Sequence, residues 1–455
     1  MSNAVRPAAG HTRVIADLVP RPHPRQPQPE PAGPRHGVGF WSVAAAYAVI
    51  LGFSAVPTPL YGLYAARDGF GSLTITIVYA VYAGGVILAL LTVGHVSDWY
   101  GRRRVMIAAL LTAALSAVLF LLWRELTGLV VARFIGGIAA GATTATATAW
   151  ITELHAARRP TATGRRAEIV AAAANLGGVG AGPLIAGVLA QWVGRPLTMP
   201  YLLFLALMAA AAVGLALTPE TRILAPVDRP RYHPQRIQAP TQARAAFFGA
   251  LIGGFIAFAA LAFFMSLAPT FLAGRLHQPS LALAGAVAFL VFAAAAVAQI
   301  LPTRFGRRAL AAVGAPWITA GSAAIVVAVQ LSPASLWLFL LGGAVLGFGG
   351  GAYFKSSLGT VIASSDPGSR AGALTSFFLA GYVGLSIPAV GLGVLAQHLA
   401  PKTSLLIFGV LLVAGVAASA GFLLRRPRQP MPQPPPSLPS RQPPAVPIPE
   451  GRSAS

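Results

Sequence analysis

Twelve long apolar segments constrain the fold of this chain more than any other feature. They run at about 39–61, 72–95, 105–123, 127–151, 168–193, 200–218, 246–271, 281–301, 309–330, 335–362, 370–398 and 404–424. Segments of about 20 apolar residues are long enough to span the hydrocarbon core of a bilayer as α-helices. Each must be helical, because a backbone exposed to lipid has to satisfy its own hydrogen bonds. We therefore predict an all-α, multi-pass membrane protein with twelve transmembrane helices.

The composition excludes a large soluble enzyme. Charged residues make up 10% of the 455 residues and hydrophobic residues 56%, whereas a soluble domain carries about 25% charged residues. Cysteine is absent, which excludes disulfides and thiolate chemistry. The sequence also contains no catalytic triad, phosphate-binding loop or cluster of metal ligands. We expect no enzymatic activity, no catalytic residues, no metal and no cofactor.

The net charge of +22 follows membrane topology rather than nucleic-acid binding. If the N-terminus is cytoplasmic, 26 of the 33 Lys and Arg residues fall in cytoplasmic segments and five in outer loops, while Arg133 and Lys355 lie within helices. This asymmetry fits the positive-inside rule. We predict a protein of the plasma (inner) membrane with both termini in the cytoplasm, where basic tails can contact lipid head groups.

Polar stretches divide the chain into five parts. Residues 1–37 and the Pro-rich residues 425–455 are predicted to be disordered cytoplasmic tails. Residues 219–245 form the longest internal polar stretch and are predicted to be a cytoplasmic central loop. This loop separates two six-helix bundles, at 38–218 and 246–424.

The two bundles repeat each other in sequence. Three patterns recur in the same order at nearly one offset: S-x-x-P-T-x-L-x-G at 54–62 and 266–274, GVLAQ at 187–191 and 393–397, and GRR at 101–103 and 306–308. Duplicated six-helix units are typical of secondary transporters, whose substrate site lies between the halves near the bilayer midplane.

The stretch GHVSDWYGRRRVM concentrates charge between the second and third apolar segments. Gly94 allows close helix approach and Gly101 permits a tight turn. Asp98, which we expect to end the second helix, can pair with a nearby arginine or with a helix N-terminus. Arg102, Arg103 and Arg104 are expected to anchor the loop at the cytoplasmic surface.

This spacing resembles the loop signature G-x-x-x-D-x-x-G-R-R of the major facilitator superfamily, and departs from it at Trp99, where a basic residue is more usual. The resemblance implies two pseudo-symmetric bundles and a charge relay that locks one access state and releases it as the halves move. The second half has Thr303 at the position of Asp98, so we expect an asymmetric lock.

Two helix motifs resemble the same family. In the fourth segment Arg133, Gly137 and Gly141 match R-x-x-x-G-x-x-x-G on one helix face. Glycines at this spacing permit close packing, and an arginine inside a membrane helix implies a partner or water.

The second motif lies in the fifth segment, where GVGAGPLIAG resembles the G-x-x-x-G-P-x-x-G-G pattern of the antiporter branch. Gly178, Gly182 and Gly187 match it, and the chain departs from it at Ala186. Pro183 removes one backbone hydrogen bond and is expected to bend the helix. The chain thus resembles a bacterial member of the drug-exporter or antiporter branch.

The resemblance implies a cavity lined by helices 1, 4, 7 and 10 with help from 2, 5, 8 and 11. The polar or aromatic candidates on these helices are Tyr47, Trp150, Asn175, Gln299, Tyr353, Lys355 and Tyr382. None of the eleven acidic residues is expected in the middle of a helix, whereas Arg133 and Lys355 lie within helices. Such a cavity favours anionic, zwitterionic or neutral molecules over simple organic cations.

The leading hypothesis is a monomeric secondary active transporter that exports a small organic molecule by alternating access, with proton exchange. Uptake of an anionic or polar metabolite is the alternative transport function. A transporter-like membrane sensor is the alternative from a different class. We expect membrane lipids as the only other partners and no nucleic acid.

Overall fold

The computed structural model describes residues 34–94, 96–222, 239–240, 243–301, 306–366 and 369–424, and these residues contain helices but no β-strand. Twelve helical segments within these ranges are long and apolar enough to cross a membrane. This confirms the number of spans expected from the sequence. The expected tails lie almost entirely outside the described residues, as does most of the central loop.

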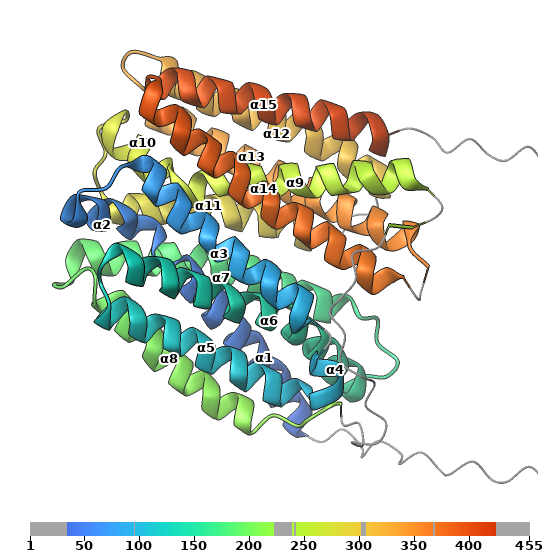
Figure 1. Cartoon of the computed structure of the whole chain (residues 1–455). Helices are drawn as coiled ribbons and strands as arrows, with labels where there is room; N and C mark the ends of the chain where they lie inside the picture. The colour runs from blue at the N-terminus through green and yellow to red at the C-terminus, as the bar shows by residue number, and fades with distance from the viewer. Residues whose placement is uncertain are drawn as a thin grey trace, which may run out of the picture.

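The membrane-spanning segments alternate in direction through both halves of the chain (Figure 1). Those of the first half are α1 (Pro34–Ala55), η1 (Thr58–Leu60), α2 (Tyr61–Asp68), α3 (Ser72–Thr92), α4 (Val96–Tyr100), α5 (Arg102–Leu122), α6 (Leu126–Arg158), α7 (Arg165–Trp192) and α8 (Met199–Ala216). Those of the second half are α9 (Arg244–Ser266), α10 (Ala268–Gly274), α11 (Leu281–Ile300), α12 (Arg307–Gln330), α13 (Leu336–Ser364), α14 (Arg370–His398) and α15 (Pro401–Leu423).

The first apolar segment, expected as one helix over 39–61, is divided. The helix α1 ends at Ala55, and the chain continues through η1 into α2. Pro57 and Pro59 account for the break, because proline lacks an N–H and its ring clashes with the preceding turn. The second half breaks in the same way between α9 and α10 beside Pro269. The duplicated sequence pattern therefore interrupts the helix at the equivalent place in both halves.

We call the end of the bundle that carries α4 the tail end, and the opposite end, which carries α2 and α10, the hairpin end (Figure 1). The stretch at 94–106 differs from the expected simple loop, because α3 already ends at Thr92 and a short helix, α4, follows. Asp98 therefore lies in α4 rather than at the end of the second membrane helix.

The most extensive contacts between the halves are those of α7 with α11 and of α3 with α14, and smaller contacts join η1 to α11 and α3 to α9. At the hairpin end the side chain of Gln191 accepts hydrogen bonds from the backbone N–H of Leu281 (2.9 Å) and the hydroxyl of Ser280 (3.4 Å). A Cβ added to Gly187 would overlap the carbonyl oxygen of Leu281. The backbones of the two halves are thus in direct contact at this end.

Candidate functional site

A cavity of about 140 Å³ lies between the two halves. Four helices of the first half (α1, α3, α6, α7) and four of the second (α9, α11, α13, α14) contribute to its wall. These are the eight spans that the family resemblance implied. A second pocket, of about 10 Å³, lies within the second half alone. The larger cavity is therefore the candidate binding site.

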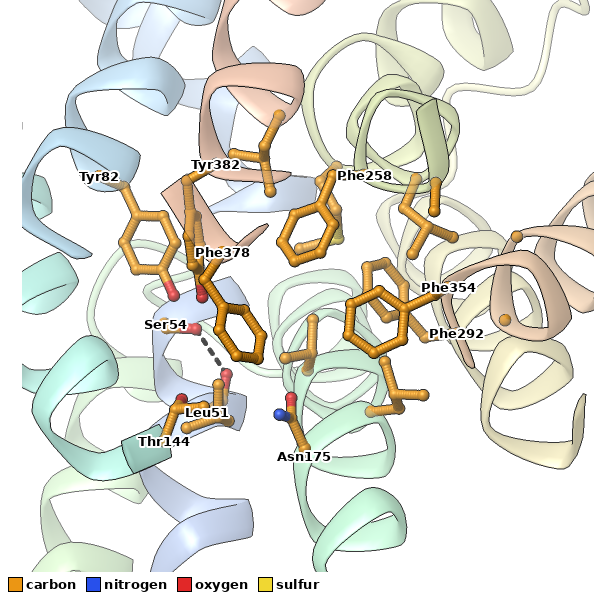
Figure 2. Close-up of a pocket in the computed structure, with 18 of the residues that line it drawn as sticks. Leu51, Ser54, Tyr82, Thr144, Asn175, Phe258, Phe292, Phe354, Phe378 and Tyr382 are labelled. Atoms are coloured by element: carbon orange, nitrogen blue, oxygen red, sulfur yellow. Dashed lines mark hydrogen bonds between the residues drawn. The ribbon is translucent and has the colours of Figure 1, made fainter. Parts of the chain in front are cut away.

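The two walls of the cavity differ in chemistry (Figure 2). The polar groups of the first half are Ser54, Tyr79, Tyr82, Arg133, Thr144 and Asn175. The phenyl rings, all from the second half, are Phe258, Phe292, Phe354 and Phe378. Figure 2 shows three of these rings gathered on one side, with Ser54 and Thr144 across from them. The cavity is therefore amphipathic: its charged group and most of its polar groups come from the first half, while all of its phenyl rings come from the second half, which also contributes Gln299 and Tyr382.

Arg133, near the start of α6, is the cation of the polar wall. Only 4% of this residue is exposed. Its Nη1 donates a hydrogen bond of 2.5 Å to the carbonyl oxygen of Ser54, which has no helical partner because α1 ends one residue later. Its guanidinium carbon lies 4.4 Å from the centre of the Tyr82 ring and 5.9 Å from that of Tyr79. Its Nε is buried without a hydrogen-bond partner among the described residues.

No described carboxylate neutralises this cation. The ion pairs within the described ranges involve Arg67 and Arg102 only, and no Asp or Glu lines the cavity. A charged side chain in the membrane interior costs about 2.5–3.5 kcal/mol. One carbonyl oxygen and two aromatic faces offset part of that cost. The cavity therefore carries an uncompensated positive charge. Within the same ranges, no group of three His, Cys, Asp or Glu residues could hold a metal ion.

Three of the seven cavity candidates line the cavity: Asn175, Gln299 and Tyr382. Asn175 donates a 2.7 Å hydrogen bond from its amide to the hydroxyl of Tyr47. Tyr382 packs against the cluster that contains Tyr82. These residues bring α7, α11 and α14 to one site.

The other four candidates lie outside the lining of the cavity. Tyr47 is buried behind Asn175. Trp150 is fully buried and donates from its indole Nε1 to the carbonyl oxygen of Pro219 (3.2 Å). Tyr353 is fully buried on the side of α13 that meets Gly314 of α12.

Lys355, the fourth of these, is half-buried, and its Nζ donates a 2.6 Å hydrogen bond to the backbone carbonyl oxygen of Gln299. The expectation of two cavity cations is therefore reduced to one, Arg133. Lys355 lies one helical turn after Gly351, which lines the cavity, but its ammonium group is directed to the α11 backbone at Gln299 instead.

The glycines of the two helix motifs lie where backbones meet. Added Cβ atoms on Gly137 and Gly141 would collide with Tyr82 and Val86 of α3. This contact brings Tyr82 close to Arg133, one turn before Gly137. In α7, Gly178 and Gly182 meet α1, Pro183 lies inside the helix, and Gly187 meets α11 of the other half.

Arg102 is the centre of a polar cluster at the tail end. It is 5% exposed. Its Nη2 donates to the carboxylates of Asp98 (2.6 Å) and Glu153 (2.9 Å), its Nε donates to Glu153 (3.3 Å), and its Nη1 donates to the hydroxyl of Ser97 (2.6 Å). The cluster ties α4 and α5 to the end of α6. All of these residues belong to the first half.

Glu220 caps the first turn of α5 from a distant part of the chain. Its two carboxylate oxygens accept hydrogen bonds from the backbone N–H groups of Arg102 (2.8 Å) and Arg103 (2.9 Å). The carboxylate can approach because Gly101, which has φ of 97°, carries no side chain: a Cβ there would collide with it. The first residues after α8 are thereby attached to the signature stretch.

The equivalent place in the second half has a different chemistry. Arg307, at the position of Arg102 in the repeat, donates to the backbone carbonyl oxygen of Gly359 (3.0 Å). Gly359 lies 206 residues after Glu153, an offset that one of the sequence repeats shares, so a glycine stands where the first half has a carboxylate. Thr303 lies outside the described residues.

Sequence reasoning missed the phenyl rings of the cavity and the roles of Glu153 and Glu220 as partners of the signature stretch. Phenylalanine gives no usable signal in a membrane helix, because it faces lipid as readily as a cavity. A signal for the two carboxylates does exist in the sequence. The chain has few acidic residues, and Glu153 and Glu220 are expected at the same end of the bundle as Arg102, Arg103 and Arg104.

Comparison with known proteins agrees with the helical membrane fold described above. The family model described as Major Facilitator Superfamily matches residues 43–327, more than half of the chain. The arabinose-proton symporter of Bacillus subtilis (strain 168) is 31% identical over 106 residues, which are 23% of this chain and 21% of that protein. The chain thus matches about a fifth of the length of this relative.

Solved structures share the fold at low sequence identity. The human organic anion transporter MFSD10 (TETRAN) is 18% identical, with a TM-score of 0.58 over 85% of this chain and 100% of that one. The nucleoside transporter NupG is 15% identical, with a TM-score of 0.63 over 84% and 99%. A POT family transporter in complex with 5-aminolevulinic acid is 13% identical, with a TM-score of 0.68 over 84% and 94%.

Proposed function

Because the chain belongs to the Major Facilitator Superfamily, we propose that it is a secondary active transporter that moves a small organic molecule across the membrane by alternating access. The observation that carries this proposal is the cavity between the halves, which receives four helices from each. A site shared in this way is exposed to opposite sides in turn when one half moves against the other.

Export in exchange for protons is the proposed direction and coupling. Its support is the motif in α7, where Gly182, Pro183 and Gly187 resemble the antiporter pattern. No Asp or Glu among the described residues lines the cavity, so proton exchange would use carboxylates such as Glu153 or Glu168 near the tail end. Uptake is the second candidate, favoured by the partial match to a proton symporter.

We place the protein in the plasma (inner) membrane with the tail end in the cytoplasm. The support is the charge asymmetry of the sequence, since 26 of 33 Lys and Arg residues fall in the segments expected to be cytoplasmic. In this orientation the cluster of Asp98, Arg102 and Glu153 lies at the cytoplasmic surface, where it is proposed to act as the conformational lock.

Flux through the purified protein in proteoliposomes tests the function. A panel of radiolabelled organic anions, neutral molecules and cations is offered with the pH gradient imposed in each direction. Gly350→Phe supplies the specific control, because Gly350 lines the cavity and an added Cβ meets only one atom, at 3.9 Å. The ring should fill the cavity and abolish flux.

Gly421→Phe is the matched control, since Gly421 is exposed on α15 and nothing lies within 4 Å of its added Cβ. It should leave flux unchanged. The proposal is wrong if no compound moves under either gradient, or if Gly350→Phe transports as well as the wild type.

A further inference from the structure

We infer that the cavity binds amphipathic organic anions, with the anionic group paired to Arg133 and an aromatic body held by the phenyl rings of the second half. This inference rests on the proposed transport function and names the class of substrate.

Arg133 is the charged group of the cavity wall, and its guanidinium still has a donor to offer. Three neutral groups of the wall already donate hydrogen bonds within the protein: the hydroxyl of Ser54 donates to Leu51 (2.7 Å), that of Thr144 donates to Ala140 (2.8 Å), and the amide of Asn175 donates to Tyr47 (2.7 Å). The guanidinium uses Nη1 for the Ser54 carbonyl oxygen and leaves Nε without a partner.

A carboxylate is the chemistry that such a group recognises. Guanidinium donors form short, charge-assisted hydrogen bonds with carboxylate oxygens. The strength of this pair increases in a site from which water is largely excluded, and Arg133 is 4% exposed. An organic cation would meet the same positive charge, and no described carboxylate in the wall would compensate for it. The site therefore selects against cations.

The opposite wall fits an aromatic body. The ring of Phe258 lies 5.8 Å from that of Phe354 and 5.2 Å from that of Tyr382, and Phe354 lies 6.4 Å from Phe378 (centroid distances). Figure 2 shows Phe258, Phe292 and Phe354 on the same side of the cavity. A cavity of about 140 Å³ resembles in size an engineered apolar cavity of about 150 Å³ that holds benzene. The ligand thus has a single aromatic ring attached to its anionic group.

Three probes with the same single ring test this inference: phenylacetate, benzyl alcohol and benzylammonium. Equilibrium binding to the detergent-purified wild type should follow the order anion, neutral alcohol, cation. Arg133→Gln should weaken binding of the anion by about tenfold or more, as expected when a hydrogen bond between charged groups is lost. It should change binding of the alcohol by less than about threefold.

Arg370→Gln is the matched control, because Arg370 is exposed at the start of α14 and carries the same charge. It should bind all three probes like the wild type. If Arg133→Gln does not fold, Arg133→Lys is the substitute, because it keeps the charge and should preserve the order in which the probes bind. Phe354→Ala should weaken binding of the anion and binding of the alcohol by the same factor. The order in the wild type needs no variant at all.

Two outcomes overturn the inference: the wild type binds the cation at least as well as the anion, or folded Arg133→Gln binds the anion as well as the wild type does. Binding and flux separate this inference from the proposed function. Selective binding of the anion without flux of any compound would contradict the proposed transport function but would still support the inferred anion site. Flux of cations or neutral molecules without selectivity for anions would contradict the inferred anion site but would still support the proposed transport function.

Discussion

Glu153→Gln is the substitution that tests the cluster around Arg102 most directly. The wild-type carboxylate accepts two hydrogen bonds from the Arg102 guanidinium, at 2.9 and 3.3 Å, and one from the hydroxyl of Thr221 at 2.5 Å. Glutamine has the same size but one acceptor oxygen, so it keeps the bond at one oxygen and loses those at the other. The loss falls on an arginine whose side chain is 7% exposed.

The magnitude follows from these contacts. A hydrogen bond to a charged group contributes about 1.5–3 kcal/mol, and the Glu153 side chain is 30% exposed, which reduces this contribution through solvent screening. We expect a loss of about 2 kcal/mol in the free energy that holds α4 and the first turn of α5 against α6, or roughly 30-fold in the opening equilibrium. Asp98→Asn should cost less than about 1 kcal/mol, because Asp98 is 41% exposed and asparagine still offers an oxygen to Nη2.

Hydrogen exchange of peptides covering 96–106, read by mass spectrometry, measures this opening. Exchange should be roughly 30-fold faster in Glu153→Gln and less than about fivefold faster in Asp98→Asn. Glu125→Gln, at an exposed residue before α6, is the matched control and should leave exchange unchanged. Equal acceleration by the Asp98 and Glu153 substitutions, or no acceleration by either, would refute the reasoning.

Three further predictions concern transport and helix ends. Asp98→Asn should reduce flux while leaving membrane insertion and ligand affinity nearly intact, since Asp98 lies in α4 at the tail end and not in the cavity; normal flux would contradict its role in the lock. Glu220→Ala should remove the cap of α5 at a cost of about 1 kcal/mol, seen as faster exchange of the first α5 amides, and equal exchange rates would show that another group caps them. Gly187→Val should lower flux by more than about tenfold, because the valine side chain would overlap the carbonyl oxygen of Leu281. Gly194→Val is the control and should transport like the wild type, because nothing lies within 4 Å of a Cβ added there.

The number and positions of the membrane spans could be predicted from the sequence, because the length and hydrophobicity of a segment are local properties. The break after Ala55 could not, although Pro57 and Pro59 were visible. Proline is tolerated within membrane helices when neighbouring groups satisfy the freed carbonyls. Here the Ser54 carbonyl is satisfied by Arg133, a residue 79 positions away, and local sequence contains no information about that contact.

The site could be predicted only in part for a related reason. The resemblance identified the helices that line the cavity, and Asn175, Gln299 and Tyr382 were among the expected residues. The rotation of each helix decides the rest. Tyr353 precedes Phe354 by one position and is buried against α12, while Phe354 lines the cavity. Rotation is set by packing among eight helices, and a single sequence does not specify it.

The division of the cavity wall between the halves has a pharmacological consequence. A small carboxylate without an aromatic body can contact Arg133 but makes few contacts with the second half. An apolar aromatic compound can contact the phenyl rings of the second half but does not pair with Arg133. Neither gives binding free energy that depends on both halves coming together, so neither favours the closed form through which a carried molecule must pass. Such compounds are expected to occupy the site as competitive inhibitors, and joining the two chemical groups in one molecule is expected to turn an inhibitor into a substrate.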